Sequence, residues 1–307
     1  RHCRSFMRLI STQAVLYTEM ITTGAILHGD AHYHLDLNPN ESPVALQLGG
    51  GNPQELSKCV KLIENYSYDE INLNCGCPSD RVQNGMIGAV MMKNANLTAD
   101  CISALVDASK LPISVKHRIG VDDFDSYDFL CDFVGAVSNT VCKTFIIHAR
   151  KAWLKGLSPK QNREIPQLNY DRVYQLKKDF PELEIIINGG ISSIQDSVDH
   201  LNQLDGVMIG REAYTNPYLL AEVDQKIYGE EKPVVKREEI AEKFCQYVDN
   251  EIVKGEKLHS MTRHMLGLFR GVKGAKQFRR HISENAQGEK ASIDVLYNAL
   301  KKVGEIS

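Results

Sequence analysis

Short apolar segments typical of strands recur along the first 210 residues, and between them apolar residues return every three or four positions. The first pattern is typical of a strand and the second of an amphipathic helix. The strand segments are residues 15–19, 44–48, 70–74, 113–116, 144–148, 184–188 and 206–209, and the helical segments include 53–65, 96–109, 126–138, 170–179 and 192–203. This alternation predicts a parallel sheet covered by helices.

Polar side chains stand at the carboxyl ends of most of these strands. They are Glu19, Gln47, Asn74, Lys116, His148 and Asn188. A (β/α)8 TIM barrel builds its site from the carboxyl ends of all its strands, whereas a doubly wound sheet binds its ligand at one switch point. We therefore predict a TIM-barrel domain over residues 1–230. Its first strand would precede Arg1, and residues 1–10 would form the helix that follows that strand.

The pattern changes after Pro217, where residues 227–233 form a charged, proline-terminated link. The segments that follow have helical spacing to the end of the chain, at residues 236–254, 259–271, 274–286 and 292–303. They predict an all-α helical bundle as a second domain, residues 231–307.

Composition describes an ordinary globular protein, with 43% hydrophobic and 24% charged residues. There is no apolar run long enough for a membrane span and no secretory leader, so we expect a cytoplasmic protein, and a monomer. The eight cysteines form no C-x-x-C pair and no zinc-like quartet. Reduced thiols and no metal site are therefore expected.

Charge is distributed unevenly although the net charge is only -3. Residues 232–307 carry 15 Lys and Arg against 10 Asp and Glu, and the six basic residues between 263 and 281 have no acid among them. A stretch of one sign is typical of contact with an anionic partner, although a solvated face is the simpler interpretation.

Two late strands run into glycines directly before a helix, at Asn188-Gly189-Gly190 and at Gly210-Arg211. Such loops present backbone N–H groups and a positive helix end to an anion. Phosphate binding after the last two strands is common in TIM barrels, so these loops predict a phosphorylated cofactor or substrate.

Three further strand-end residues favour a flat, anionic cofactor. Lys116 would point into the barrel mouth, where a desolvated ammonium needs an anionic partner such as a reduced flavin. Gln47 offers a donor and an acceptor to a heterocycle edge, and His148 could contact phosphate or ring. Each alone is more often a structural polar residue.

The strand of residues 70–74 ends in the turn Cys75-Gly76-Cys77-Pro78. A single cysteine is more often a buried structural residue than a reactive one. However, a thiol at a strand end is held by rigid backbone, and a neighbouring glycine leaves room for a flat ligand. We expect Cys77 to be reactive and Cys75 to be a packing residue.

These segments carry a resemblance to a known family. Residues 72–85, 116–120, 145–157 and 188–190 resemble the tRNA-dihydrouridine synthases, with the A-type bacterial enzymes most similar, and the similarity extends from Arg1 to about residue 300. The family's Ala-Pro-Met segment, which lies against the flavin, has no counterpart here. The resemblance implies an FMN-containing TIM barrel with a C-terminal tRNA-binding domain. Such an enzyme reduces the C5=C6 bond of uridine with NADPH, and for the A-type at tRNA positions 20 and 20a.

The resemblance also implies roles for individual residues. Cys77 would protonate C5 of the uridine while a hydride from FMN N5 reaches C6. The implied FMN contacts are Gln47, Lys116, His148, Asn188, Gly189, Gly190, Gly210 and Arg211, and the implied tRNA contacts are Asn74, Lys160, Arg163, Lys276 and Arg279.

Two alternatives remain open at the level of sequence. One is a flavin barrel for a small molecule, similar to dihydroorotate dehydrogenase, although a free pyrimidine would not require the basic helical tail. The other is a non-catalytic RNA-binding protein in which Cys77 is simply buried.

Overall fold

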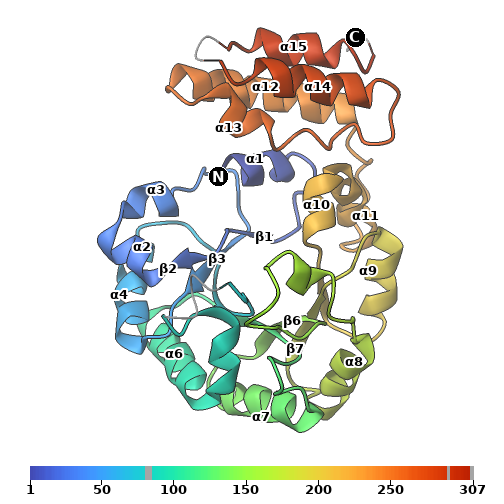
Figure 1. Cartoon of the computed structure of the whole chain (residues 1–307). Coiled ribbons are helices and arrows are strands. Elements are labelled where there is room, and N and C mark those ends of the chain that lie inside the picture. Colours follow the sequence, from blue (N-terminus) through green and yellow to red (C-terminus); the bar gives the residue numbers. More distant parts are fainter. Residues whose placement is uncertain (80–84, 289–290, 305–307) are drawn as a thin grey trace. The chain divides into compact units, whose positions relative to one another are not determined.

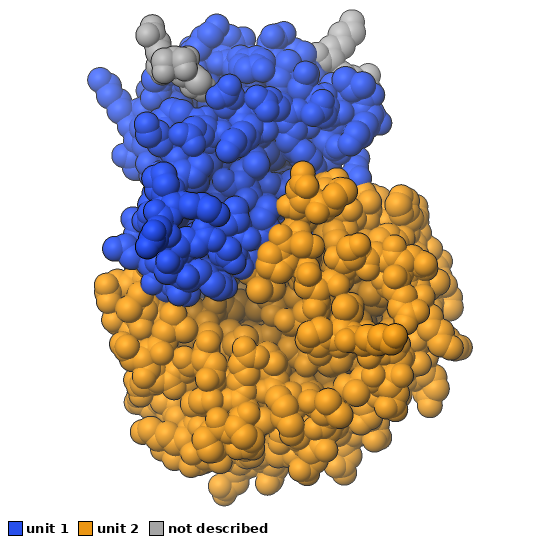
Figure 2. All heavy atoms as spheres, turned by 180° about the vertical axis from the view of Figure 1, so that it is seen from behind, with its two compact units in different colours: residues 1–14, 210–307 blue, residues 15–209 orange. Residues whose placement is uncertain are grey.

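A computed structural model of the chain describes residues 1–79, 85–288 and 291–304. It contains two compact units: residues 15–209, the barrel unit, and residues 1–14 with 210–307, the helical unit (Figure 2). The units thus separate at residue 210, and residues 1–14 group with the C-terminal helices. The predicted boundary at residue 230 separates a catalytic domain from a tRNA-binding domain, and this functional division stays a prediction. Residues 80–84, part of the motif that carries the resemblance, lie outside the described residues.

The barrel unit is built on one parallel sheet. Its strands follow the order β1-β3-β4-β5-β6-β7-β8, with β2 also paired to β3. Their bounds are β1 Leu16–Tyr17, β2 Ile21–Thr22, β3 Val44–Gly49, β4 Glu70–Cys75, β5 Ile113–Arg118, β6 Thr144–His148, β7 Glu184–Asn188 and β8 Gly206–Met208.

Helices surround this sheet and bury their apolar faces against it (Figure 1). They are α2 Thr23–His28, α3 Ala31–Leu35, α4 Pro53–Ile63, the 3₁₀ helix η1 Gly88–Lys93, α6 Ala95–Ala108, α7 Tyr127–Ser138, the 3₁₀ helix η2 Gln161–Arg163, α8 Tyr170–Asp179 and α9 Ile194–Leu201. The α/β TIM-like fold predicted from the alternation is thereby confirmed. Among the described residues, no pairing joins β8 to β1 or β2.

Capping side chains explain where the larger barrel helices begin. An Asn or Ser immediately before each helix accepts a hydrogen bond from a backbone N–H of its first turn, and these residues are Asn52, Asn94, Ser126, Asn169 and Ser193. Such caps satisfy donors that have no partner within the helix. The predicted helix starts were therefore close to the observed ones.

The predicted strand at residues 15–19 is wrong in its bounds, because only Leu16–Tyr17 form a strand there, β1, and the next strand, β2, lies beyond it at Ile21–Thr22. Between them the backbone N–H of Gln47 donates to the side-chain hydroxyl of Thr18, at 2.9 Å. The side chain replaces the backbone acceptor at this position, so the ladder is interrupted there.

The helical unit contains α1 and the helices after residue 210. They are α1 His2–Arg8, α10 Arg211–Thr215, the 3₁₀ helix η3 Pro217–Glu222, α11 Val223–Lys226, α12 Arg237–Val253, α13 Leu258–Thr262, α14 Ala275–Asn285 and α15 Asp294–Leu300. Edge-to-face contacts join Phe6 to Phe244 and Phe269 to Phe278, with ring centroids 4.9 and 5.0 Å apart. The first pair explains why the amino-terminal residues belong to this unit. No described helix is long and apolar enough to span a bilayer.

The predicted helix at residues 259–271 is wrong beyond Thr262, where α13 ends. The following residues form turns with i to i+3 backbone hydrogen bonds. Arg237 Nε donates to the carbonyl of Leu268 at 2.9 Å, and Gly271 has a φ of 83°. Residues in the left-handed conformation, and backbone carbonyls that accept from a side chain, are both typical of the segment after a helix end.

Candidate functional site

A continuous column of hydrogen-bonded side chains fills the barrel interior beside β4. Asn72 Nδ2 donates to Ser114 Oγ at 2.7 Å, Gln47 Nε2 donates to Asn72 Oδ1 at 2.8 Å, and Asn74 Nδ2 donates to Gln47 Oε1 at 2.7 Å. At the other end of the column, Ser114 Oγ donates to Glu70. Buried polar groups need such partners, so the column holds the side chains at the strand ends in fixed positions.

The turn that carries Cys77 is fixed by this column. Asn74 Oδ1 accepts hydrogen bonds from the backbone N–H groups of Gly76 and Cys77, each at 3.0 Å. The Cys77 carbonyl accepts from Ala89 N at 2.8 Å, and a Cβ on Gly88 would lie 2.4 Å from that carbonyl oxygen. Gly88, with φ of 82°, is therefore required for η1 to pack against the turn. Cys77 itself stays partly exposed in the turn after β4.

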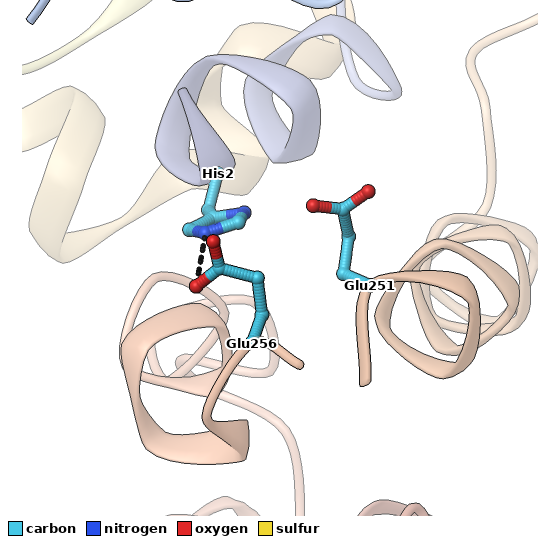
Figure 3. A group of neighbouring side chains, drawn as sticks. All are labelled: His2, Glu251 and Glu256. Carbon is cyan, nitrogen blue, oxygen red and sulfur yellow. Dashed lines mark ion pairs between the residues drawn. The ribbon is translucent and has the colours of Figure 1, made fainter. Parts of the chain in front are cut away.

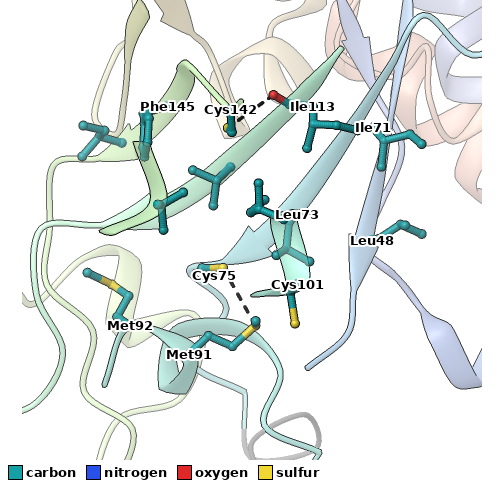
Figure 4. Packing of buried hydrophobic residues seen from close by; sticks show 14 of the residues in the cluster. Leu48, Ile71, Leu73, Cys75, Met91, Met92, Cys101, Ile113, Cys142 and Phe145 are labelled. Atoms are coloured by element: carbon teal, nitrogen blue, oxygen red, sulfur yellow. Dashed lines mark hydrogen bonds between the residues drawn. The ribbon is translucent and has the colours of Figure 1, made fainter. Parts of the chain in front are cut away.

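Cys75, the last residue of β4, lies on the face opposite Asn72 and Asn74 and is a packing residue, as expected. It is fully buried, and its Sγ contacts Met91 Sδ at 3.9 Å, in the apolar layer that includes Met92 and Cys101 (Figure 4). Burial raises the pKa of the Cys75 thiol well above its ordinary value. This thiol is therefore protonated and inaccessible.

Lys116 reaches across the barrel interior from β5. Its Nζ donates to Asn188 Oδ1 at 2.9 Å, and Asn188 Nδ2 donates to the carbonyl of Met208 at 2.8 Å. Burial, together with the nearby Arg118, lowers the pKa of Lys116 to about 7. In the part of the chain that the structure describes, Lys116 has no carboxylate partner, so an anionic ligand would stabilise its charged form.

His148 ends β6 in the same region. Burial, followed by the charges of Arg118 and Lys116, lowers its pKa to about 2, so the ring is neutral. Its Nδ1 is buried without a hydrogen-bond partner among the described residues. A buried ring nitrogen of this kind indicates a group that meets a ligand or water.

The glycines after β7 are needed at their positions, and two backbone N–H groups that follow them already have a hydrogen-bond partner. Gly189 and Gly190 have φ of 110° and 77°, and a Cβ on Gly190 would lie 2.6 Å from Leu168. The Asp196 carboxylate accepts from Ser192 N and Ser193 N, at 3.0 and 3.1 Å, in a capping box. The N–H groups of Ser192 and Ser193, which precede α9, are therefore already occupied, and the backbone of Gly189 and Gly190 remains for a phosphate.

The loop of residues 149–166, between β6 and α8, is organised by Asn162, which is fully buried. Asn162 Oδ1 accepts from Trp153 N at 2.7 Å, and its Nδ2 donates to the carbonyls of Trp153 and Leu157 at 2.9 and 3.2 Å. Lys160 and Arg163 lie on either side of it, Lys160 exposed and Arg163 half-buried. Two predicted tRNA contacts thus belong to one well-ordered loop.

Arg118 joins this loop to the Cys77 turn. Its Nε donates to the carbonyl of Gly76 at 2.8 Å, and its Nη1 donates to the carbonyls of Lys151 and Asn162, both at 3.1 Å. The sequence reasoning assigned no role to Arg118, although alternation along β5 places it on the same face as Lys116. Asn162 and Gly88 were missed as well.

Comparison with known proteins identifies the family. Residues 1–303 match the family described as dihydrouridine synthase (Dus). The chain belongs to this family. A tRNA-dihydrouridine(20/20a) synthase of Vibrio vulnificus is 57% identical over 304 residues, covering 99% of this chain and 93% of that protein. The protein of the same name from Escherichia coli K12 is 56% identical over 306 residues, covering 99% and 88%.

A solved structure of 2,3-dimethylmalate lyase resembles this synthase with a TM-score of 0.47 and 14% identity, over 82% of this chain and 87% of that one. Family membership makes the chain an oxidoreductase that forms dihydrouridine, and it decides against both alternatives that the sequence left open.

The helical unit of the synthase carries the other predicted contacts. Gly210 precedes α10 and Arg211 is its first residue. On α14, Ala275, Phe278 and Ile282 are buried, whereas Lys276 and Arg279 are exposed on the other face and have no ion-pair partner among the described residues. An exposed, unpaired basic face suits phosphate contacts.

Three side chains in the helical unit could ligate a metal ion, but their carboxylates are paired with Arg and Lys side chains. His2, Glu251 and Glu256 have ligand atoms within 4.8 Å of one another (Figure 3). Arg1 Nη2 lies 2.6 Å from Glu256 Oε1 and 3.5 Å from Glu251 Oε2, and Lys254 Nζ lies 2.6 Å from Glu251 Oε1. Since both carboxylates have cationic partners, we interpret the group as an ion-pair network.

Proposed function

We propose that this chain reduces the C5=C6 bond of uridines 20 and 20a in tRNA to dihydrouridine, with FMN as its cofactor and NADPH as the electron donor. One observation carries the proposal: in a chain of the dihydrouridine synthase family, a partly exposed thiol, Cys77, lies in the turn after β4, in the unit where Lys116 and His148 have unfilled bonding capacity. The names of the relatives support the two tRNA positions.

The residues present fit a flavin mononucleotide. Lys116 is half-buried and its ammonium donates to a neutral amide, so an anionic flavin would complement its charge. His148 Nδ1 offers an unused ring nitrogen, and Gly189 and Gly190 leave the strand end free of side chains. Gln47, Asn188, Gly210 and Arg211 complete the proposed contacts. Bound FMN, reduced by NADPH, would supply the hydride that reaches C6.

Cys77 would supply the proton. Its Sγ–H bond breaks as a C–H bond forms at C5, and the resulting thiolate recovers a proton from water after product leaves. Asn74 and Arg118 hold the turn from which Cys77 projects, so the thiol has a defined position relative to the barrel interior. A uridine in folded tRNA must leave its stack to reach such a site.

The proposed tRNA contacts come from both units. Lys160 and Arg163 belong to the loop of residues 149–166, and Lys276 and Arg279 belong to the exposed face of α14. Asn74 is nearly buried, with Oδ1 bound to two N–H groups, so its contact with tRNA would be limited to one remaining N–H. Two of the bonds that Asn74 already makes hold the Cys77 turn, and the third joins it to Gln47.

The test is replacement of Cys77 by Ala in the FMN-loaded protein. Flavin reduction by NADPH should proceed at the wild-type rate, because no bond to the cofactor is proposed for the thiol. Dihydrouridine at positions 20 and 20a, measured by mass spectrometry of the tRNA, should fall by about a hundredfold or more, the size of a general acid's contribution. Full product formation by the Ala variant would contradict the proposal.

A further inference from the structure

The loop of residues 149–166 and the Cys77 turn are far apart in sequence but share one buried arginine. Arg118 is 4% exposed, and it donates to Gly76 in the turn and to Lys151 and Asn162 in the loop. All three acceptors are backbone carbonyls. A guanidinium presents its N–H groups in a rigid plane, so these bonds fix the two segments relative to each other.

Asn162 passes this constraint to the rest of the loop. Its backbone carbonyl accepts from Arg118, and its side chain bonds Trp153 on one side and Leu157 on the other. Other bonds anchor the start of the loop, since Ala152 N donates to Gly120 O at 2.9 Å and Leu154 N donates to Asp122 Oδ1 at 2.8 Å. The loop would therefore stay folded if the link were cut, but its register with the Cys77 turn would loosen.

We propose that Arg118 and Asn162 are positioning residues, which set the distance between the loop that carries Lys160 and Arg163 and the thiol that protonates the uridine. This inference rests on the proposed function, because it assumes that the loop holds RNA and that Cys77 is the acid. Proton transfer needs donor and carbon within hydrogen-bond reach, so a small displacement between the two segments slows the reaction without preventing binding.

The variants are Arg118→Lys, which keeps the charge but loses the planar fork, and Asn162→Ala. The control is Arg172→Gln, which removes another partly buried arginine of the barrel unit, one that donates to Asp125 O and Oδ1 at 3.0 and 2.9 Å. Each FMN-loaded protein is measured twice in stopped flow. Flavin reduction by NADPH is followed first without tRNA, and flavin reoxidation by excess tRNA is then followed over a range of tRNA concentrations.

Both variants should be reduced by NADPH at the wild-type rate and should be half-saturated at a tRNA concentration close to that of the wild type. Their reoxidation at saturating tRNA should be slower by about tenfold to a hundredfold. Because one link contains both residues, the double variant should be no slower than the slower single variant. Arg172→Gln should match the wild type in both measurements.

Normal reoxidation in both variants would overturn the proposal. Multiplied losses in the double variant, or an equal loss of flavin reduction, would overturn it as well, because the effects would then be independent or general. Cys77→Ala in the same assay separates this failure from that of the proposed function. If Cys77→Ala is inactive while Arg118→Lys is normal, only the positioning proposal fails; if Cys77→Ala is reoxidised normally, the proposed function fails.

Discussion

Two sets of polar side chains in the barrel unit differ in how completely they are bonded. Asn72, Asn162 and Arg118 are nearly or fully buried and donate to, or accept from, groups of the protein on two or more sides. Lys116 and His148 lie in the same region, but Lys116 has one neutral partner and His148 has a buried nitrogen without any among the described residues.

The difference separates residues that build the site from residues that meet its ligands. A saturated network lowers the free energy of the protein alone, because each buried group has its partner. An unsatisfied buried group raises it, and persists where a ligand supplies the missing interaction. Substitutions in the two sets should therefore change the stability of the apoprotein in opposite directions.

Lys116→Met should give the largest effect. Without the ammonium, FMN should bind about tenfold to a hundredfold more weakly, which is the loss of one charge-assisted hydrogen bond. The apoprotein should unfold at a higher temperature than the wild type, because a desolvated charge is replaced by an apolar chain of similar length. Flavin fluorescence titration and differential scanning calorimetry measure the two quantities.

The pH dependence of this stabilisation follows from the lowered pKa of Lys116. Its folded-state pKa of about 7 lies below the ordinary value of 10.5. Between these values the unfolded chain binds the extra proton, so wild-type stability rises with pH relative to the Met variant. The advantage of Lys116→Met should be greatest below about pH 7 and fade toward about pH 10.5. Lys110→Met, at an exposed lysine, should show neither effect, and an unchanged FMN affinity in Lys116→Met would contradict the assignment.

Asn72→Ala tests the saturated set and should have the opposite sign. It leaves Gln47 Nε2 without its acceptor and Ser114 Oγ without its donor, inside a region where Asn72 is fully buried. The free energy of unfolding of the apoprotein should fall by about 1–3 kcal/mol in urea titrations. Asn65→Ala, at an exposed asparagine, should change it by less than about 0.5 kcal/mol. Equal stability of Asn72→Ala and wild type would remove the distinction between the two sets.

Much of this arrangement could be predicted from the sequence, for local reasons. The two-residue period and the capping Asn and Ser residues determined where strands and helices lie, and the period also places Lys116, His148 and Asn188 at the strand ends. Alternation along β4 also places Cys75 on the apolar face, opposite Asn72 and Asn74. Each of these signals depends on neighbours only a few positions away.

The parts that were missed depend on contacts between distant segments. No local pattern shows that Arg118 reaches residues 76, 151 and 162, or that the Cys77 carbonyl lies against Gly88. The capping box of Ser193 and Asp196, by contrast, is a local pattern that the sequence shows and that the prediction did not use. The predicted helix at 259–271 ends at Thr262, and the side chain that bonds the Leu268 carbonyl beyond it comes from Arg237, far away in the sequence.

Cys75→Val should give the smallest effect, and it is the matched control for Cys77→Ala at a cysteine two positions away. Cys75 is fully buried beside Met91, and Val replaces it with a branched apolar group of similar size. Such substitutions cost less than about 1.5 kcal/mol of stability. Flavin reduction and dihydrouridine formation should both stay near wild type, measured in the assays used for Cys77→Ala. A loss of product as large as that of Cys77→Ala would mean that any change near the end of β4 stops the reaction. The loss in Cys77→Ala would then be no evidence that Cys77 is the proton donor.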